Sequence, residues 1–234
     1  MNKNFRVTCL CFFVLIVSAV FAIPATAQPV FFKNTWSRPP EHIPNNASID
    51  APLMGNGRVT MSVGYSANSL RYYLSRNDFW RLRSQADNLS GPRAASQLNI
   101  NLIGFNDSSF SAEQLLQNGI TTCRLGAEKS SGLVSRSWVS ATENLVFIEL
   151  TAVGKEIKLN IGLSAPENSQ AVQGRGSSGN MLWLTRAFTD SVDIKTEVAV
   201  GLKIMPGGDS VVSLRPGKKV ILALCVESNF SQKC

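Results

Sequence analysis

Two clusters of polar and aromatic residues bracket the segment from Leu53 to Arg81, which reads LMGNGRVTMSVGYSANSLRYYLSRNDFWR. A tryptophan ring packs on the C–H face of a sugar, while amides, carboxylates and guanidinium groups bind sugar hydroxyls. The same residue types also shape turns and domain interfaces. The candidate carbohydrate-contact or domain-interface residues are Asn56, Arg58, Asn77, Asp78, Trp80 and Arg81. Their alternative role is turn chemistry at the end of a β-sandwich.

Asp78 is the one acidic residue in a setting that suggests catalysis, because it lies beside Trp80. Glycoside hydrolysis requires two carboxyl groups that face one cleft. The sequence does not identify a second acid to pair with Asp78. We therefore assign no catalytic residue, and a small glycosidase that uses Asp78 stays an alternative.

The sequence lacks the residue patterns that other kinds of catalytic site need. The single histidine, His42, lies in a proline-rich segment without a nucleophile motif, which favours an exposed loop residue over a triad base or a metal ligand. Gly174–Gly179 matches G-x-G-x-x-G, but a strand-like segment follows it where a dinucleotide site needs a helix. We interpret it as a flexible hairpin loop and expect neither a cofactor nor a metal site.

The charge distribution argues against a nucleic-acid partner. The net charge is +7, yet the basic residues are scattered, and their longest run is Lys218-Lys219. Proteins that bind nucleic acids cluster their basic residues on one face or stripe. With 44% hydrophobic and 17% charged residues, the composition is that of a globular protein with a core.

Residues 1–27 have the pattern of a secretory signal peptide. Lys3 and Arg6 precede a long apolar stretch, and Ala25-Thr26-Ala27 supplies the cleavage pattern before Gln28. We predict a secreted or extracytoplasmic protein, with an uncleaved signal anchor as the alternative. No later segment is long and apolar enough to cross a membrane.

The secreted context bears on the cysteines and on glycosylation. Cys123, Cys225 and Cys234 would remain after cleavage, so at most one internal disulfide can form and its pairing stays open. N-x-Ser/Thr motifs mark four candidate glycosylation sites. These sites are Asn46, Asn88, Asn106 and Asn229.

The pattern of apolar residues predicts an all-β fold. Residues 28–52, rich in proline and asparagine, should form an extended leading loop, and residues 53–234 a sandwich domain. About ten short apolar or alternating runs, Met181–Phe188 among them, with turn signals between them favour two packed antiparallel sheets. A helix is expected only at 111–119, and we expect Trp36, Trp138 and Trp183 in the core.

The two polar clusters also resemble a known family. Gly55-Asn56-Gly57-Arg58, followed by a hairpin and then Asn77-Asp78-Phe79-Trp80, resembles the N-terminal domain of family 95 glycoside hydrolases, the α-L-fucosidase and α-L-galactosidase family. The related family 65 enzymes share this pattern. The resemblance implies a large, galactose-mutarotase-like β-super-sandwich that precedes an (α/α)6 catalytic barrel. Thr60 and Arg81 depart from the family pattern, which puts the details of the hairpin and of the domain interface in question.

In that family the catalytic residues lie in the helical barrel, which we do not find in the sequence up to Cys234. The resemblance therefore implies a non-catalytic N-terminal domain of a secreted glycoside hydrolase, one that packs on a helical catalytic domain and contacts carbohydrate. A stand-alone carbohydrate-binding module is the alternative from a different class of protein.

Overall fold

Fifteen β-strands and no helix make up the described part of the chain, so the predicted all-β class is confirmed. The computed structural model describes residues 32–43, 49–84, 90–107, 109–126, 131–166, 171–189, 192–207 and 209–230. The predicted signal peptide, Cys234 and the sequons at Asn46 and Asn88 lie outside these ranges. No helix within them could span a membrane.

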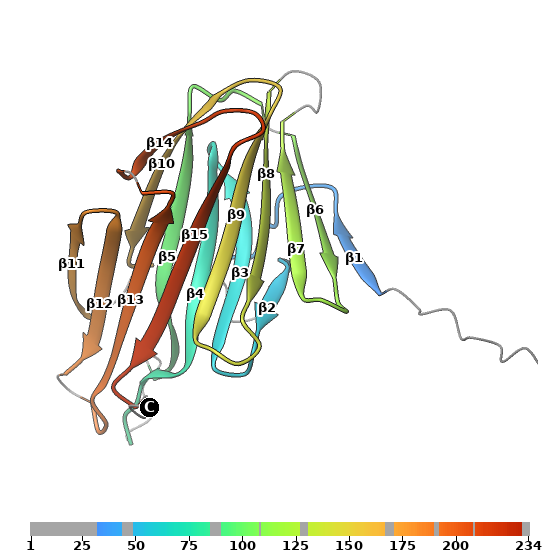
Figure 1. Cartoon of the computed structure of the whole chain (residues 1–234). Coiled ribbons are helices and arrows are strands. Elements are labelled where there is room, and N and C mark those ends of the chain that lie inside the picture. Colours follow the sequence, from blue (N-terminus) through green and yellow to red (C-terminus); the bar gives the residue numbers. More distant parts are fainter. Residues whose placement is uncertain are drawn as a thin grey trace, which may run out of the picture. The chain divides into compact units, whose positions relative to one another are not determined.

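The larger sheet has nine antiparallel strands and faces the viewer in Figure 1. In spatial order its strands are β1 (Lys33–Trp36), β6 (Phe110–Leu115), β7 (Ile120–Leu125), β8 (Gly132–Val139), β9 (Leu145–Val153), β15 (Lys219–Ser228), β13 (Thr196–Met205), β12 (Met181–Phe188) and β11 (Val172–Ser178). Strands β1 and β11 are its edges. The run from β6 to β9 is a simple meander, whereas β15 inserts between β9 and β13.

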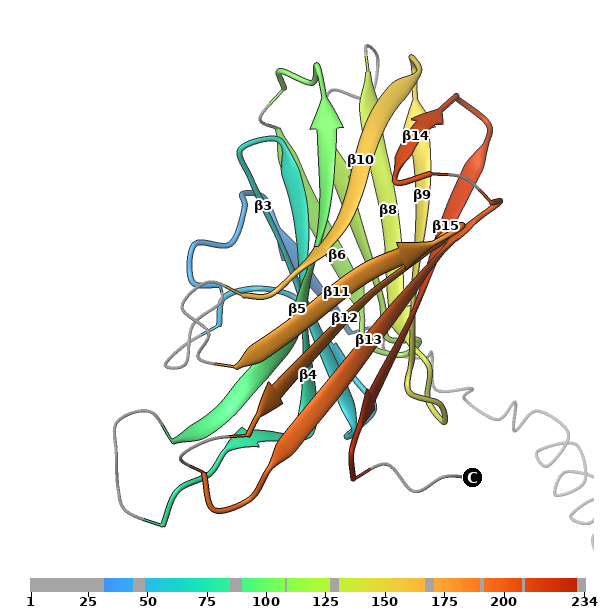
Figure 2. The same cartoon turned by 90° about the vertical axis from the view of Figure 1, so that its left-hand side faces the viewer.

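The smaller sheet has six antiparallel strands and lies behind the first in Figure 1. In spatial order its strands are β14 (Val211–Leu214), β10 (Ile157–Ser164), β5 (Gly91–Ile103), β4 (Ser69–Arg81), β3 (Val59–Ser66) and β2 (Leu53–Gly55). Strands β12 and β13 cross β4, β5 and β10 at an angle, and this packing closes one side of the sandwich (Figure 2).

The core lies between the two sheets and follows from the period-two pattern of the strands. Val146, Ile148 and Leu150 of β9 point inward, as do Leu98 and Ile100 of β5, and all five are fully buried. Residues that alternate with them point outward on both sheets. Each sheet therefore has one apolar face in the core and one outer face that is free to carry a site.

A buried hydroxyl pair links the two layers. The Tyr72 phenol of β4 lies 2.6 Å from the Ser135 hydroxyl of β8. Burial raises the pKa of Tyr72 above its ordinary range, so the phenol stays protonated as a hydrogen-bond partner. The pair holds one register between the sheets, since each hydroxyl would otherwise be buried without a polar partner.

The helix expected at 111–119 is wrong. Residues Phe110–Leu115 form β6, which pairs with β1 on one side and β7 on the other. Ala112 and Gln114 alternate into the interior, and Gln114 donates a 2.7 Å hydrogen bond to the Leu53 carbonyl. Gly119, at a φ of 65°, ends the turn between β6 and β7. Pairing with two neighbours outweighs the helical propensity of a short segment.

The prediction of a loop at Gly174–Gly179 is also wrong for most of this segment. Residues up to Ser178 belong to β11 and pair with β12, and only Gly179 and Asn180 form the turn. Trp183 of β12 was expected in the core, but it is 44% exposed on the outer face. Trp36 and Trp138 are half-buried.

Part of the expected leading loop is regular structure. Lys33–Trp36 forms β1 and pairs with β6 at the edge of the nine-stranded sheet. Arg38–Ile43 has no regular structure, as expected, and His42 within it is exposed.

The two cysteines within the described residues do not pair with each other. Cys123 is a buried free thiol whose pKa is raised by burial to about 12, and Cys225 is a half-buried free thiol on the outer face of β15. A thiol with so high a pKa is unreactive at neutral pH, so Cys123 serves packing.

Candidate functional site

The β2–β3 turn brings Asn56 into a clamp between two hairpins. Its side-chain amide donates to the carbonyls of Ser140 and Glu143 at 2.8 and 2.9 Å. Its side-chain oxygen accepts from the Arg58 and Val59 amides, each at 2.9 Å. Both donors and the acceptor oxygen are thus used within the protein. Asn56 is a structural residue that ties the β2–β3 turn to the β8–β9 loop.

Arg58 and Asn77 lie side by side, as the hairpin prediction requires. The Asn77 amide donates a 3.0 Å hydrogen bond to the Arg58 carbonyl, so the two sequence clusters meet at one end of the β3–β4 hairpin. Both side chains are exposed. They remain candidates for contact with a ligand or another domain.

Asp78 forms hydrogen bonds within a polar network between the two sheets. It accepts hydrogen bonds from Arg76 at 3.2 Å and from the Ser228 hydroxyl at 2.7 Å. Arg76 is almost fully buried, lies 3.5 Å from the Glu227 carboxylate and donates to the Val226 carbonyl at 2.8 Å. Asp78 and Glu227 thus flank one buried guanidinium. This arrangement compensates a buried positive charge, which is a structural task for both carboxylates.

Trp80 and Arg81 follow irregular pairing between β4 and β5, where the register shifts after Leu74 and again after Ser75. The Trp80 indole donates a 2.7 Å hydrogen bond to the Asn77 carbonyl and remains 37% exposed. The Trp80 carbonyl accepts from the Thr196 hydroxyl at 2.7 Å. Arg81 is buried. The six predicted residues therefore do not line one cleft. Some of them form buried or structural contacts at the end of the hairpin, and the others have exposed side chains.

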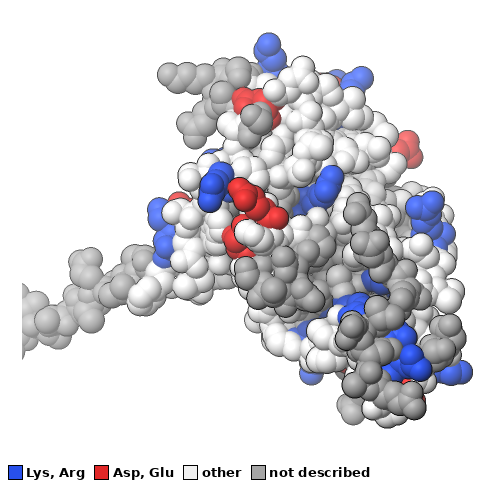
Figure 3. Space-filling view, turned by 180° about the vertical axis from the view of Figure 1, so that it is seen from behind, with Lys and Arg blue, Asp and Glu red and all other residues white. Residues whose placement is uncertain are grey.

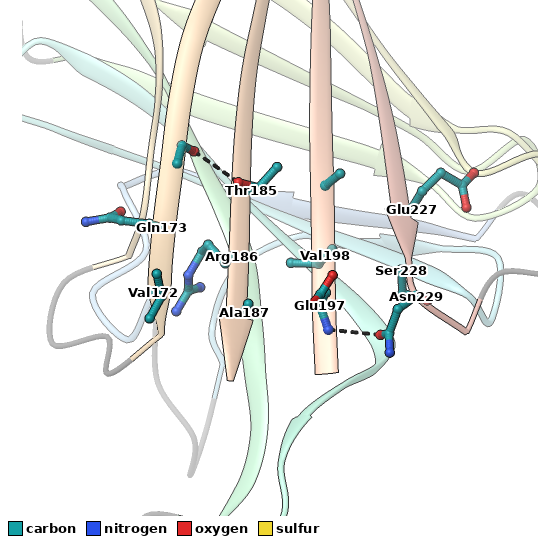
Figure 4. Close-up of a pocket in the computed structure, with 12 residues that line it drawn as sticks. Val172, Gln173, Thr185, Arg186, Ala187, Glu197, Val198, Glu227, Ser228 and Asn229 are labelled. Carbon is teal, nitrogen blue, oxygen red and sulfur yellow. Dashed lines mark hydrogen bonds between the residues drawn. The ribbon is translucent and has the colours of Figure 1, made fainter. Parts of the chain in front are cut away.

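A shallow hollow of about 610 Å³ lies on the outer face of the nine-stranded sheet, over β11, β12, β13 and β15 (Figure 4). Gly174, Thr185 and Ala199 form its floor, and their small side chains are the reason for the depression. Glu197, Glu227 and Asn229 belong to the same lining and add carboxylate and amide groups. A hollow of this size accommodates one or two sugar units.

Trp183 lies beside this hollow on the same face of β12, two residues before Thr185. Its indole lies flat on β11, because a Cβ built on Gly176 would stand 2.5 to 2.8 Å from three atoms of the ring. Gly174 also contacts the ring, at 3.6 Å from its own hypothetical Cβ. One face of the indole is therefore fixed against backbone, and 44% of the residue is open to solvent.

A buried cation lies beneath the floor. Arg186 points to the inner side, between β11 and β12 (Figure 4). It donates to the Ala94 carbonyl and stands 5.3 Å above the Phe79 ring. Burial, and then the nearby Arg93, lower the pKa of Arg186 to about 10, so the group is still charged at neutral pH. It fixes the sheet under the hollow.

The polar groups of the hollow are positioned by their neighbours. Asn144 donates to both oxygens of Glu227 at 3.0 and 3.1 Å. The Asn229 side chain accepts from the Glu197 amide at 2.9 Å and donates to the Lys195 carbonyl at 3.1 Å. Carboxylates held in this way are suited to accept hydrogen bonds from hydroxyl groups. Within the described ranges, His, Cys, Asp and Glu form no group of three that could hold a metal ion.

Sequence reasoning did not select the residues of this hollow, although a signal for Trp183 was present. Met181, Trp183 and Thr185 alternate with Leu182, Leu184 and Arg186, and the second set includes two leucines. That pattern puts the tryptophan on the outer face of a half-buried strand. The grouping of Glu197 and Glu227 in this hollow depends on β15 pairing with β13, and no local pattern reveals that order.

Comparisons with known proteins leave the resemblance to family 95 supported only by the chain's own motifs. A scan against protein-family models finds no match, and a search of curated proteins finds no relative. The resemblance thus rests on the blocks Gly55–Arg58 and Asn77–Trp80, together with the all-β fold in which they lie.

Proposed function

We propose that this protein is a non-catalytic, carbohydrate-binding β-sandwich domain of a secreted glycoside hydrolase that resembles the family 95 α-L-fucosidases. Its binding site is the hollow on the outer face of β11, β12, β13 and β15, with Trp183 as the stacking platform. In the family that it resembles, such a domain packs on a helical catalytic domain.

The observation that carries the proposal is the posture of Trp183. When a mobile, exposed indole binds a ligand, the entropic cost of ordering its ring weakens the affinity. Here the ring already lies flat on Gly174 and Gly176 before any ligand binds. Sugars present apolar C–H faces that pack on such a surface. A ring fixed in advance and open on one side is therefore suited to bind a sugar.

The hollow adds the polar half of sugar recognition. Glu197, Glu227 and Asn229 line the hollow and offer hydrogen-bond acceptors and donors there. Sugar hydroxyls bind to groups of this kind, and orientation by neighbouring side chains reduces the entropic cost of binding. Because the hollow is shallow, it favours binding to the end or to the side of a sugar chain.

The surroundings of the acids favour binding over hydrolysis. A general acid needs a carboxyl group that can hold and release a proton at the scissile bond. Asp78 is held by Arg76 and Ser228, and Glu227 is held by Asn144 and lies near Arg76. Both carboxylates thus already have hydrogen-bond or ion-pair partners within the protein. The alternative of a small glycosidase that uses Asp78 receives no support from this geometry.

Titration of the purified protein with fucosyllactose and with lactose, followed by backbone amide NMR, tests the proposal. With fucosyllactose, at least, we expect amide shifts that are confined to β11–β13 and β15. We expect no release of fucose on long incubation. Failure of both sugars and of a wider glycan panel to shift these resonances would refute carbohydrate binding at this site.

Hydrolysis is examined in the same samples. If fucose is released and Asp78→Asn abolishes the release, the non-catalytic assignment is wrong and the Asp78 alternative is correct. Release that persists in Asp78→Asn at the same rate indicates a contaminating enzyme, and the binding result then decides alone.

A further inference from the structure

A second hollow, of about 470 Å³, lies on the opposite side of the sandwich, where the segment Arg38–Ile43 passes over β3 and β4. It is on the outer face of the six-stranded sheet and shares no residue with the hollow beside Trp183. Figure 3 views this side of the molecule and shows acidic and basic side chains gathered on it.

The segment that roofs this hollow is held in place by contacts of Glu41, His42 and Ile43. Ile43 packs directly on Gly64, where a Cβ would come within 2.3 Å of the isoleucine side chain. The Asp50 carboxylate accepts from the Glu41 amide at 2.8 Å and from the His42 amide at 2.9 Å. The roof is thus part of the folded structure, and the hollow beneath it is preformed.

Arg71 of β4 lies in this hollow opposite Gly64 in the strand register. It is half-buried, and its Nε is fully buried without a hydrogen-bond partner. No described carboxylate forms an ion pair with it: Glu41, the one acid in the lining, lies 3.9 Å from Arg38 instead. A guanidinium group has five donors and is always charged, so partial burial without an acceptor costs free energy. That cost is recovered when an anionic group enters.

The rest of the lining indicates what kind of molecule carries the anion. Tyr73 and Ser66 supply hydroxyl groups beside Arg71, whereas Pro39, Pro40 and Ile43 form an apolar wall. Hydroxyls opposite an apolar wall match a small ring with polar edges and C–H faces. The size of the hollow fits a molecule of one or two rings.

We infer that this hollow binds a small carboxylate-bearing molecule of the sugar-acid class, with the carboxylate paired to the Arg71 guanidinium. Both oxygens of a carboxylate can bind the planar fork of an arginine, which gives direction as well as charge pairing. The ring lies against Pro39 and Pro40, and its hydroxyls face Tyr73 and Ser66. The site is independent of the carbohydrate site proposed on the other sheet.

The probes are glucuronate, its uncharged counterpart glucose, and sulfate, each titrated into the purified protein and followed by backbone amide NMR. We expect glucuronate to shift the amides of β3, β4 and Arg38–Ile43, and glucose to shift them at least ten-fold more weakly. Equal responses to glucuronate and glucose, or none to glucuronate, overturn the inference. So does a response to sulfate alone, which would make the hollow an inorganic anion site.

Two variants test whether glucuronate binding depends on Arg71. Arg71→Gln should lower glucuronate affinity at least ten-fold, whereas Lys158→Gln, which removes a positive charge from the outer face of β10, beyond β5 in the same sheet, should leave it unchanged. Equal losses in both variants would mean that general charge, not this site, attracts the ligand. If Arg71→Gln does not fold, Arg71→Lys and Tyr73→Phe carry the test, with intermediate losses expected.

Trp183→Ala separates this inference from the proposed function. Glucuronate binding should be unaffected by that variant because Trp183 lies on the other sheet. If both fucosyllactose and glucuronate lose affinity in Trp183→Ala, the ligand occupies the hollow over β11–β13 and the Arg71 site is refuted.

Discussion

The side-chain amide of Asn56 donates a 2.8 Å hydrogen bond to the carbonyl of Ser140, 84 residues away in the sequence. This bond joins the β2–β3 turn of one sheet to the β8–β9 loop of the other. Gly57, at a φ of 88°, lets the chain turn so that the Arg58 and Val59 amides reach the asparagine oxygen. The Gly55–Arg58 motif is therefore explained by a turn that fastens the two sheets together.

Removal of this clamp should destabilise the fold. Asn56→Ala leaves two amides and two carbonyls without their partner, and we expect a loss of about 2 kcal/mol in the free energy of unfolding. Urea denaturation followed by tryptophan fluorescence measures it. Asn77→Ala is the matched control, because the Asn77 side chain is exposed and forms no hydrogen bond with a described residue. Equal losses in both variants would show that the clamp contributes nothing.

The Tyr72–Ser135 pair should behave as a unit. Tyr72→Phe leaves the buried Ser135 hydroxyl without its 2.6 Å partner and should cost about 1 to 2 kcal/mol in unfolding free energy. Ser135→Ala in the same chain removes the second hydroxyl, so the double variant should lose less than the sum of the two single losses. A double-mutant cycle by urea denaturation checks this. Strict additivity would rule out coupling across the two sheets.

Trp183→Ala should separate binding from stability. If fucosyllactose binds to wild type, the variant should bind at least ten-fold more weakly, since a stacked ring often dominates such a site. The unfolding free energy should fall by no more than about 1 kcal/mol, because the indole is already 44% exposed. Met181→Ala, on the same strand and face and 46% exposed, is the control and should keep its affinity. Titration calorimetry with each variant makes the comparison.

How far the sequence predicts this fold differs from element to element. The strand Met181–Phe188 is predicted with its observed bounds, because alternation there is regular and turns flank it. At 111–119, SAEQLLQNG has helical propensity and predicts a helix, whereas the observed strand depends on partners far away in the sequence. Short segments whose structure is set by pairing cannot be read locally.

The candidate site shows the same limit. Sequence spacing correctly brought Arg58 and Asn77 together, since they share one hairpin. It could not show that Asp78 is bound to Ser228, 150 residues later, because that contact needs the order of strands in two sheets. Residue type alone predicts Trp183 in the core, whereas the glycines of β11 leave room for its ring on the outer face.

Acid should loosen the segment that roofs the Arg71 hollow. The Glu41 amide, and after it the His42 groups, lower the pKa of Asp50 from its ordinary 3.8 to about 2. Because the folded-state pKa is the lower one, the stabilisation is complete above about pH 4 and is lost as the pH falls towards 2. The amide resonances of Glu41 and His42 should report this titration. Asp50→Asn should show no such change between pH 4 and 2, and a change that persists in it would assign the titration to another group.

Gly176 should be more important for the Trp183 platform than its position on an edge strand suggests. A methyl group at Gly176 would lie 2.5 to 2.8 Å from the indole, so Gly176→Ala must lift the ring off β11. We expect this variant to weaken fucosyllactose binding several-fold and to shift the Trp183 indole N–H resonance. Gly201→Ala is the matched control: Gly201 pairs with Trp183 from the other side, and a Cβ there meets no atom within 4 Å. If Gly201→Ala and Gly176→Ala have equal effects, or if neither weakens binding, the flat indole is not what the sugar recognises. A loss in Gly176→Ala alone means that the posture of the ring, and not only its presence, sets the affinity.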